Sequence, residues 1–163
     1  TTWFVEKKTS GGGMFIDTLI HSIDLYRFLV GEAQSVKASY HVVHPKLHVE
    51  DTGIILIQSK SGTIGTLEGS WQTPVAENVI DIMGTKGSVS INYNTGNLKY
   101  KFQADNEWKT LQQPGEAKDR FYLGIKSFLQ SITTGKEPLV TGSDGLRAME
   151  ILEKAYSSCK VRQ

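Results

Sequence analysis

The sequence predicts an α+β fold, a two-layer domain whose open, mainly antiparallel sheet carries its helices on one face. Three observations lead to that class. Apolar residues recur with a helical period near the start of the 163-residue chain, with a period of two through its middle, and with a helical period again at its end. Short turns, not helices, separate the middle strands, so neighbouring strands must run antiparallel.

The first helix is predicted over residues 13–30. Three glycines (11–13) precede it, Ser10 is a candidate N-cap, and Gly31 is the residue type that commonly ends a helix. At about 100° per residue, one arc of this helix is apolar and is expected to face the core. That arc holds Phe15, Ile16, Leu19, Ile23, Tyr26 and Val30.

The opposite arc of this helix carries polar groups in an apolar setting. Asp17, His21 and Asp24 fall together at i, i+4 and i+7. A solvated face would be more charged than this one, whose other members are Met14, Leu25 and Phe28. Two carboxylates and one imidazole among apolar side chains indicate a cleft or a domain interface.

Seven strands are predicted in the middle of the chain. Most are separated by glycine- or asparagine-containing turns, such as those at residues 61–62, 84–87 and 94–97. The predicted strands are 36–42, 52–57, 63–71, 79–83, 89–93, 98–102 and 108–111.

Two further helices are predicted after the strands. The first, over 118–134, ends at Gly135 and has an apolar stripe of Phe121, Ile125, Phe128, Leu129 and Ile132. The second, over 143–160, is expected to start at a cap on Ser143 or Asp144. It should bury Leu146, Met149, Ile151, Leu152 and Tyr156.

Composition narrows the possible partners. The formal net charge of +1 gives no reason to expect nucleic acid or an anionic membrane as partner, and no apolar run is long enough for a bilayer span. The one cysteine, Cys159, cannot form an internal disulfide, which fits a reducing compartment and a cytoplasmic protein. The chain begins Thr1-Thr2-Trp3, as a fragment of a longer protein would.

The strongest candidate for chemistry is the pair Asp17 and His21. An aspartate one turn before a histidine can orient the imidazole, which can then take a proton from a hydroxyl. A plain polar pair on a helix surface is the alternative, because such pairs are common. A metal cluster is disfavoured because its spacing matches no known motif; its candidate ligands are His41, His44, His48, Glu50 and Asp51.

Several segments together resemble one family, the Gfo/Idh/MocA oxidoreductases. Its central signature is similar to the three glycines followed by Asp17-x-x-x-His21-x-x-Asp24. Glu50-Asp51-Thr52 and residues 61–71 resemble its middle strands. Residues 84–89 and 135–148 resemble its later segments, so the likeness covers nearly the whole chain in the family's order.

The resemblance implies that residues 1–163 form a single α+β substrate and dimerisation domain, similar to the C-terminal domain of glyceraldehyde-3-phosphate dehydrogenase. The family's N-terminal Rossmann domain, with its glycine-rich loop and its catalytic lysine in a Glu-Lys-Pro motif, is absent from this chain. Lys136-Glu137-Pro138 has another order and place and does not match that motif. By the resemblance His21 is the acid/base, Asp17 is its partner, and Asp24 is structural.

The implied function is the substrate-binding and catalytic half of an NAD(P)-dependent dehydrogenase acting on a sugar, polyol or related molecule. NAD or NADP would be held mainly by the missing domain, so the isolated chain is expected to be inactive and to bind no dinucleotide tightly. Family members commonly pair through their sheets, so we expect a homo-oligomer formed through the free sheet face. That face is mixed, with Thr66, Glu68 and Ser70 interleaved against Leu67 and Trp71. The alternative is a non-catalytic binding or dimerisation module of the same fold.

Overall fold

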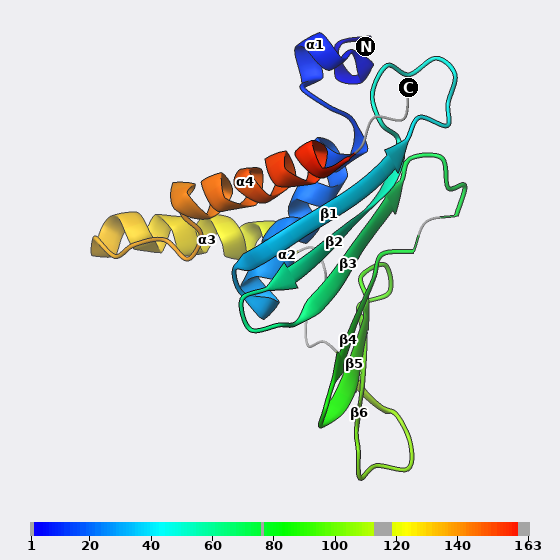
Figure 1. Cartoon of the computed structure of the whole chain (residues 1–163). Helices are drawn as coiled ribbons and strands as arrows, with labels where there is room; N and C mark the ends of the chain where they lie inside the picture. The colour runs from blue at the N-terminus through cyan, green and yellow to red at the C-terminus, as the bar shows by residue number, and fades with distance from the viewer. Residues whose placement is uncertain (1, 76, 113–118, 160–163) are drawn as a thin grey trace. The chain divides into compact units, whose positions relative to one another are not determined.

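A computed structural model describes residues 2–75, 77–112 and 119–159 of the chain (Figure 1). By their internal contacts these residues form two compact units. The first unit combines residues 1–73 with 140–163, and the second is the intervening stretch 74–139. The first unit contains both residues of the predicted catalytic pair, Asp17 and His21.

The first unit is built on a three-stranded antiparallel sheet. Its strands are β1 (Ala33–His41), β2 (Thr52–Ser59) and β3 (Ile64–Ser70), in the order β1-β2-β3. Alternate residues of the strands face the core: Val36 pairs with Ile57, and Ile55 pairs with Leu67. On β1 the intervening residues are exposed, which confirms the alternation predicted for this part of the chain.

Helices cover one face of this sheet (Figure 1). A π-helical segment, η2 (Phe15–Leu19), runs directly into α2 (Ile20–Val30), and α4 (Gly142–Ser158) packs beside them. The predicted core arc is confirmed, because its members are buried or half-buried in one cluster. The helix of 13–30 thus has nearly the predicted bounds, with a π-helical turn that the periodicity did not predict.

The N-terminal lead-in forms two short helical turns, η1 (Thr2–Val5) and α1 (Lys7–Ser10). Ser10 was expected to cap the following helix, and this expectation is wrong. Its hydroxyl donates to the carbonyl oxygens of Glu6 and Gly12, at 3.0 and 2.7 Å, so it closes α1 instead of accepting from the next helix.

The start and the buried face of α4 differ from the prediction. Thr141, not Ser143 or Asp144, is the N-cap: its hydroxyl accepts from the Asp144 N–H, and the Asp144 carboxylate accepts from the Thr141 N–H at 2.8 Å. Leu146 and Met149 are exposed, at 61% and 44%. The helix buries a narrower stripe with two small residues, which lets it lie close to the sheet: Ala148, Ile151, Leu152 and Ala155.

The second unit holds a separate four-stranded antiparallel sheet in the order β4-β5-β6-β7. Its strands are β4 (Val79–Gly84), β5 (Gly87–Asn92), β6 (Asn97–Phe102) and β7 (Lys109–Gln112). The antiparallel α+β class is confirmed, but the strands divide between two sheets where one was expected. Among the described residues β3 pairs only with β2 and β4 pairs only with β5, with irregular chain around Pro74 between them.

Helix α3 (Asp119–Thr134) also belongs to the second unit. Its range matches the predicted 118–134, except that residue 118 lies outside the described residues, as does residue 160 of the last predicted helix. The predicted apolar stripe of α3 is exposed, between 54% at Leu129 and 72% at Phe121. Its packing on the three-stranded sheet stays a prediction.

Candidate active site

The candidate site is the outward face of the helix formed by η2 and α2. Backbone approaches another segment closely where this helix begins: the N–H of Met14 donates to the carbonyl oxygen of Glu50 at 2.8 Å. A Cβ on Gly13 would collide with that same oxygen, and a Cβ on Gly12 would collide with the Tyr156 hydroxyl. The glycines are therefore required for close packing at this helix start.

Glu50 fixes the start of the helix from a distant part of the chain. One of its oxygens, Oε1, accepts from the N–H groups of Gly13 and Phe15, at 2.9 and 3.1 Å. The same oxygen accepts from the Tyr156 hydroxyl of α4 at 2.6 Å. Because Glu50 is only 5% exposed, these three donors hold a carboxylate at the positive end of a helix inside the protein.

Tyr156 closes this arrangement from α4. Burial, followed by the hydrogen bond to the Glu50 carboxylate, raises the pKa of Tyr156 far above its ordinary value of 10.0. The Tyr156 ring also lies against Phe15 and Tyr40, with ring centroids 5.5 and 6.3 Å apart. Sheet, loop and both helices thus meet where the candidate site helix begins. We call Gly13, Glu50 and Tyr156 the anchor.

Asp17 and His21 lie on the exposed side of the anchored helix. Asp17 sits within the π-helical turn, where the Ile20 N–H donates to the Phe15 carbonyl, and π-helical turns are frequent at functional sites. No hydrogen bond joins Asp17 to His21 among the described contacts. The Asp17 carboxylate instead accepts from the Thr18 hydroxyl at 3.1 Å.

The other members of the polar arc separate from this pair. Asp24 faces Arg27 at 3.6 Å, and Arg27 also binds Glu32 at 2.8 Å and the Asp144 carbonyl at 3.0 Å. Asp24 thus belongs to an ion cluster that ties α2 to the start of α4. Met14 was expected beside the catalytic pair, which is wrong: it is 0% exposed and packs on Gly69 of β3.

Leu25 is half-buried, and Phe28 is 76% exposed, so of the three apolar neighbours expected beside the pair only Phe28 projects fully outward.

The histidine-rich segment before β2 serves structural contacts. Asp51 is buried, and its two oxygens accept from the N–H groups of Val43 and His44, both at 2.8 Å. Burial alone would raise the pKa of Asp51, but these backbone donors hold it below its ordinary value. Among the described residues no group of three or more His, Cys, Asp or Glu side chains is placed to hold a metal ion.

A contact that the sequence did not predict lies next to Asp17. The indole N–H of Trp71, at the end of β3, donates to the Thr18 hydroxyl oxygen at 3.1 Å. The Trp71 ring also stacks on Phe4, with centroids 5.5 Å apart. Nothing in the local sequence pattern of either residue indicates their meeting, since 53 residues separate them.

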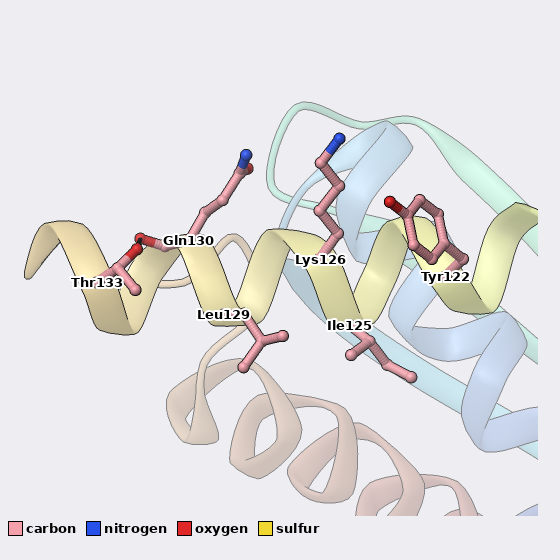
Figure 2. Close-up of a pocket in the computed structure, with 6 residues that line it drawn as sticks. All are labelled: Tyr122, Ile125, Lys126, Leu129, Gln130 and Thr133. Atoms are coloured by element: carbon pink, nitrogen blue, oxygen red, sulfur yellow. Dashed lines mark hydrogen bonds between the residues drawn. The ribbon is translucent and has the colours of Figure 1, made fainter.

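The second unit has a shallow apolar groove along α3, shown in Figure 2. Its lining residues all come from α3, and no second helix or strand in the described part of the chain contributes to it. They are Tyr122, Ile125, Lys126, Leu129, Gln130 and Thr133. Lys126 and Gln130 point to the same side in Figure 2, whereas Ile125 and Leu129 point to another. None of the residues of the candidate site contributes to this groove, and its shape is that of a helix surface.

Comparison with known proteins identifies the family. A family model described as "Oxidoreductase family, C-terminal alpha/beta domain" matches residues 1–163, the whole chain. The chain belongs to the Gfo/Idh/MocA oxidoreductase family. The resemblance found in its motifs is confirmed by this match.

Individual relatives are distant. D-apiose dehydrogenase of Rhizobium rhizogenes is 26% identical over 87% of this chain and 45% of its own length. Myo-inositol 2-dehydrogenase of Thermotoga maritima is 28% identical over 85% of this chain and 44% of its own length. A structure of levoglucosan dehydrogenase in complex with NADH and levoglucosan has a TM-score of 0.89 at 22% identity, covering 96% of this chain and 50% of that one.

The chain therefore spans about half the length of the relatives it matches. None of the helices in the described part of the chain combines the length and the apolar character that a membrane span requires.

Proposed function

We propose that this chain is the substrate-binding and catalytic half of an NAD(P)-dependent oxidoreductase. Its substrate would be a hydroxyl or carbonyl compound of the sugar or polyol class. D-apiose and myo-inositol, which appear in the names of two relatives, belong to that class. The observation that carries the proposal is the placement of Asp17 and His21. Both project from the exposed face of a helix that is anchored to the core by Glu50.

We expect no tight dinucleotide site on this chain. At the helix start that follows Gly11–Gly13, the N–H groups of Gly13 and Phe15 are bound to the Glu50 carboxylate, so they are not free to hold a pyrophosphate. The nicotinamide cofactor would therefore be bound mainly by a preceding Rossmann domain, and it would supply the acceptor of the substrate's hydride. Calorimetry on the isolated chain should then show no submicromolar affinity for NAD or NADP.

The proposed chemistry of this chain is proton transfer. The neutral imidazole of His21 takes the proton of the substrate hydroxyl while the same carbon gives up hydride, and a carbonyl forms. The Asp17 carboxylate, one turn earlier, stabilises the imidazolium and orients the ring. Both side chains are exposed in this unit, where a preceding domain can cover them, and a covered site strengthens the attraction between the two charges.

Steady-state kinetics of the full-length protein across pH tests this proposal. His21→Ala should lower kcat by about 10²–10⁴-fold, the usual contribution of general acid–base catalysis, without changing cofactor affinity. Asp17→Asn should lower kcat less and change the pH profile, because the ring remains while its partner's charge is lost. A His21→Ala enzyme with near wild-type kcat on its true substrate would refute this assignment, and Asp17 and His21 would then be a structural pair on the helix surface.

We also propose self-association through the uncovered face of the three-stranded sheet. Ile54 and Leu56 are exposed there, at 37% and 43%, in the middle strand. Lys37 stands opposite Leu56 on β1, and Glu68 stands opposite Ile54 on β3. A face with an apolar centre and both signs of charge can complement itself across a two-fold axis. Sedimentation of the full-length protein tests it, and a monomer at high micromolar concentration would refute it.

Small-molecule chemistry with a nicotinamide coenzyme fits the reducing environment that the single Cys159 suggests, so we propose a cytoplasmic enzyme.

A further inference from the structure

We propose that Thr18 and Trp71 are positioning residues for Asp17, acting as a hydrogen-bond relay. The Trp71 indole N–H donates to the Thr18 oxygen at 3.1 Å, and the Thr18 hydroxyl donates to Asp17 Oδ2, also at 3.1 Å. This inference rests on the proposed function, because Asp17 must take part in catalysis for its orientation to matter.

The direction of the relay follows from the groups themselves. An indole N–H can only donate, and an ionised carboxylate can only accept. The Thr18 hydroxyl has a single hydrogen, and the Trp71 donor occupies one of its oxygen lone pairs. Its hydrogen is therefore directed to the carboxylate of Asp17. The relay holds Oδ2 and leaves Oδ1 of Asp17 for the imidazole of His21.

Trp71 is itself held by several contacts. Its backbone N–H donates to the Asp51 carbonyl at 2.7 Å, which fixes the residue at the end of β3. Its ring is half-buried and stacks on Phe4 of η1 at an interplanar angle of 26°. These contacts fix the Trp71 indole relative to the sheet. The hydrogen bonds through Thr18 in turn fix the Asp17 carboxylate relative to the sheet.

Stability is a poor explanation for these two hydrogen bonds. Both lie at exposed positions, where water can replace either partner at little cost. Orienting the Asp17 carboxylate is a better explanation for them. A hydrogen bond to an ionised acceptor is directional, and it strengthens when a covering domain excludes water.

Full-length variants separate the roles. Thr18→Val removes the hydroxyl and keeps the branched shape, Thr18→Ser keeps the hydroxyl, and Trp71→Phe keeps an aromatic ring without the N–H. Trp3→Phe is the matched control, because Trp3 packs edge-on against Phe4 and its N–H is not part of the relay.

Thr18→Val should lower kcat by about tenfold, the effect of losing one hydrogen bond to a charged group. Because this hydrogen bond orients Asp17 and does not bind substrate, KM should stay near its wild-type value. Thr18→Ser should restore kcat. Trp71→Phe should lower kcat by less, and it should lower kcat no further when Thr18→Val is also present.

If His21→Ala inactivates the protein but Thr18→Val leaves kcat unchanged, the relay alone is overturned. A change in KM without a change in kcat would also overturn it, because Thr18 would then be a substrate contact. Near wild-type kcat in His21→Ala would instead refute the proposed catalytic role of Asp17 and His21, whatever Thr18→Val does.

Discussion

Within the first unit, two helices that pack on the three-stranded sheet begin in different ways. α4 begins with a local device, since Thr141 and Asp144 lie three residues apart and cap each other. The helix that carries Asp17 has no side-chain cap of its own at Met14. Its first N–H groups bind Glu50, which follows Gly13 by 37 residues and Phe15 by 35.

This difference ties the candidate site to the fold of the whole unit. The N-terminal cap of α4 is formed by residues only three positions apart, although Arg27 of α2 also binds the Asp144 carbonyl. The start of η2 depends on a loop carboxylate and on a tyrosine 106 residues beyond it. Asp17 and His21 therefore keep their positions only while sheet, loop and α4 are assembled around the anchor.

The largest expected effect is from Glu50→Ala. This change leaves two backbone N–H groups and the Tyr156 hydroxyl without their acceptor in a buried position. Since each buried unsatisfied polar group costs about 1–3 kcal/mol, we expect a loss of about 3 kcal/mol or more in the free energy of unfolding. Denaturant unfolding of the full-length protein measures it, and kcat should fall with it.

Hydrogen exchange localises that effect. Amides of residues 12–20 should exchange much faster in Glu50→Ala, while those of residues 141–148 should change little. Glu153→Ala is the control, because Glu153 is an exposed glutamate on α4. Equal protection of both helix starts in Glu50→Ala would show that the anchor does not hold the helix.

The contrast also explains what the sequence could reveal. Periodicity and turn residues located the strands and helices because these signals are local: the first helix, expected over 13–30, ends at Val30 before Gly31 as predicted. The motif placed Asp17 and His21 on one exposed helix face for the same reason. The sequence did not reveal four features, because packing between distant segments determines them. These are the π-helical turn, the burial of Met14, the role of Glu50 and the contact of Trp71 with Thr18.

The cap of α4 was misplaced for a different reason. Ser143 and Asp144 both have side chains of the capping type, and sequence preference alone does not choose among adjacent candidates. Backbone geometry decides, since Thr141 is extended while the residues after it are helical. A three-residue spacing between Thr141 and Asp144 was a usable signal, because it matches the pattern of a capping box.

A smaller effect is expected from Tyr156→Phe, and it depends on pH. The pKa of Tyr156 is raised in the folded protein, by burial first and then by Glu50, so its contribution to stability is present below its ordinary pKa of 10.0 and is lost as pH rises above that value. The wild type should therefore lose stability between neutral pH and about pH 11 faster than Tyr156→Phe does.

Unfolding by denaturant at a series of alkaline pH values measures this difference. At neutral pH the variant should be about 1–2 kcal/mol less stable, because Glu50 loses one donor. Tyr122→Phe, an exposed tyrosine on α3, is the control and should behave as the wild type. Parallel alkaline curves for wild type and Tyr156→Phe would mean that the Tyr156 hydroxyl is not held by the Glu50 carboxylate.

The smallest effect is expected at the local helix start, from Thr141→Ala. Removing an N-cap hydroxyl costs about 1 kcal/mol at neutral pH. Hydrogen bonds from the backbone N–H and hydroxyl of Thr141 lower the pKa of Asp144, so this part of the stability is present above its ordinary pKa of 3.8 and is lost as pH falls below it. The α4 cap should therefore weaken in acid, whereas the contribution of Tyr156 to the anchor weakens in alkali.

In Thr141→Ala the exchange of amides 142–146 should be faster at neutral pH and less sensitive to acid, whereas Ser143→Ala, the neighbouring change on the same turn, should leave both unchanged. If Ser143→Ala had the larger effect, the capping box would not be what begins α4.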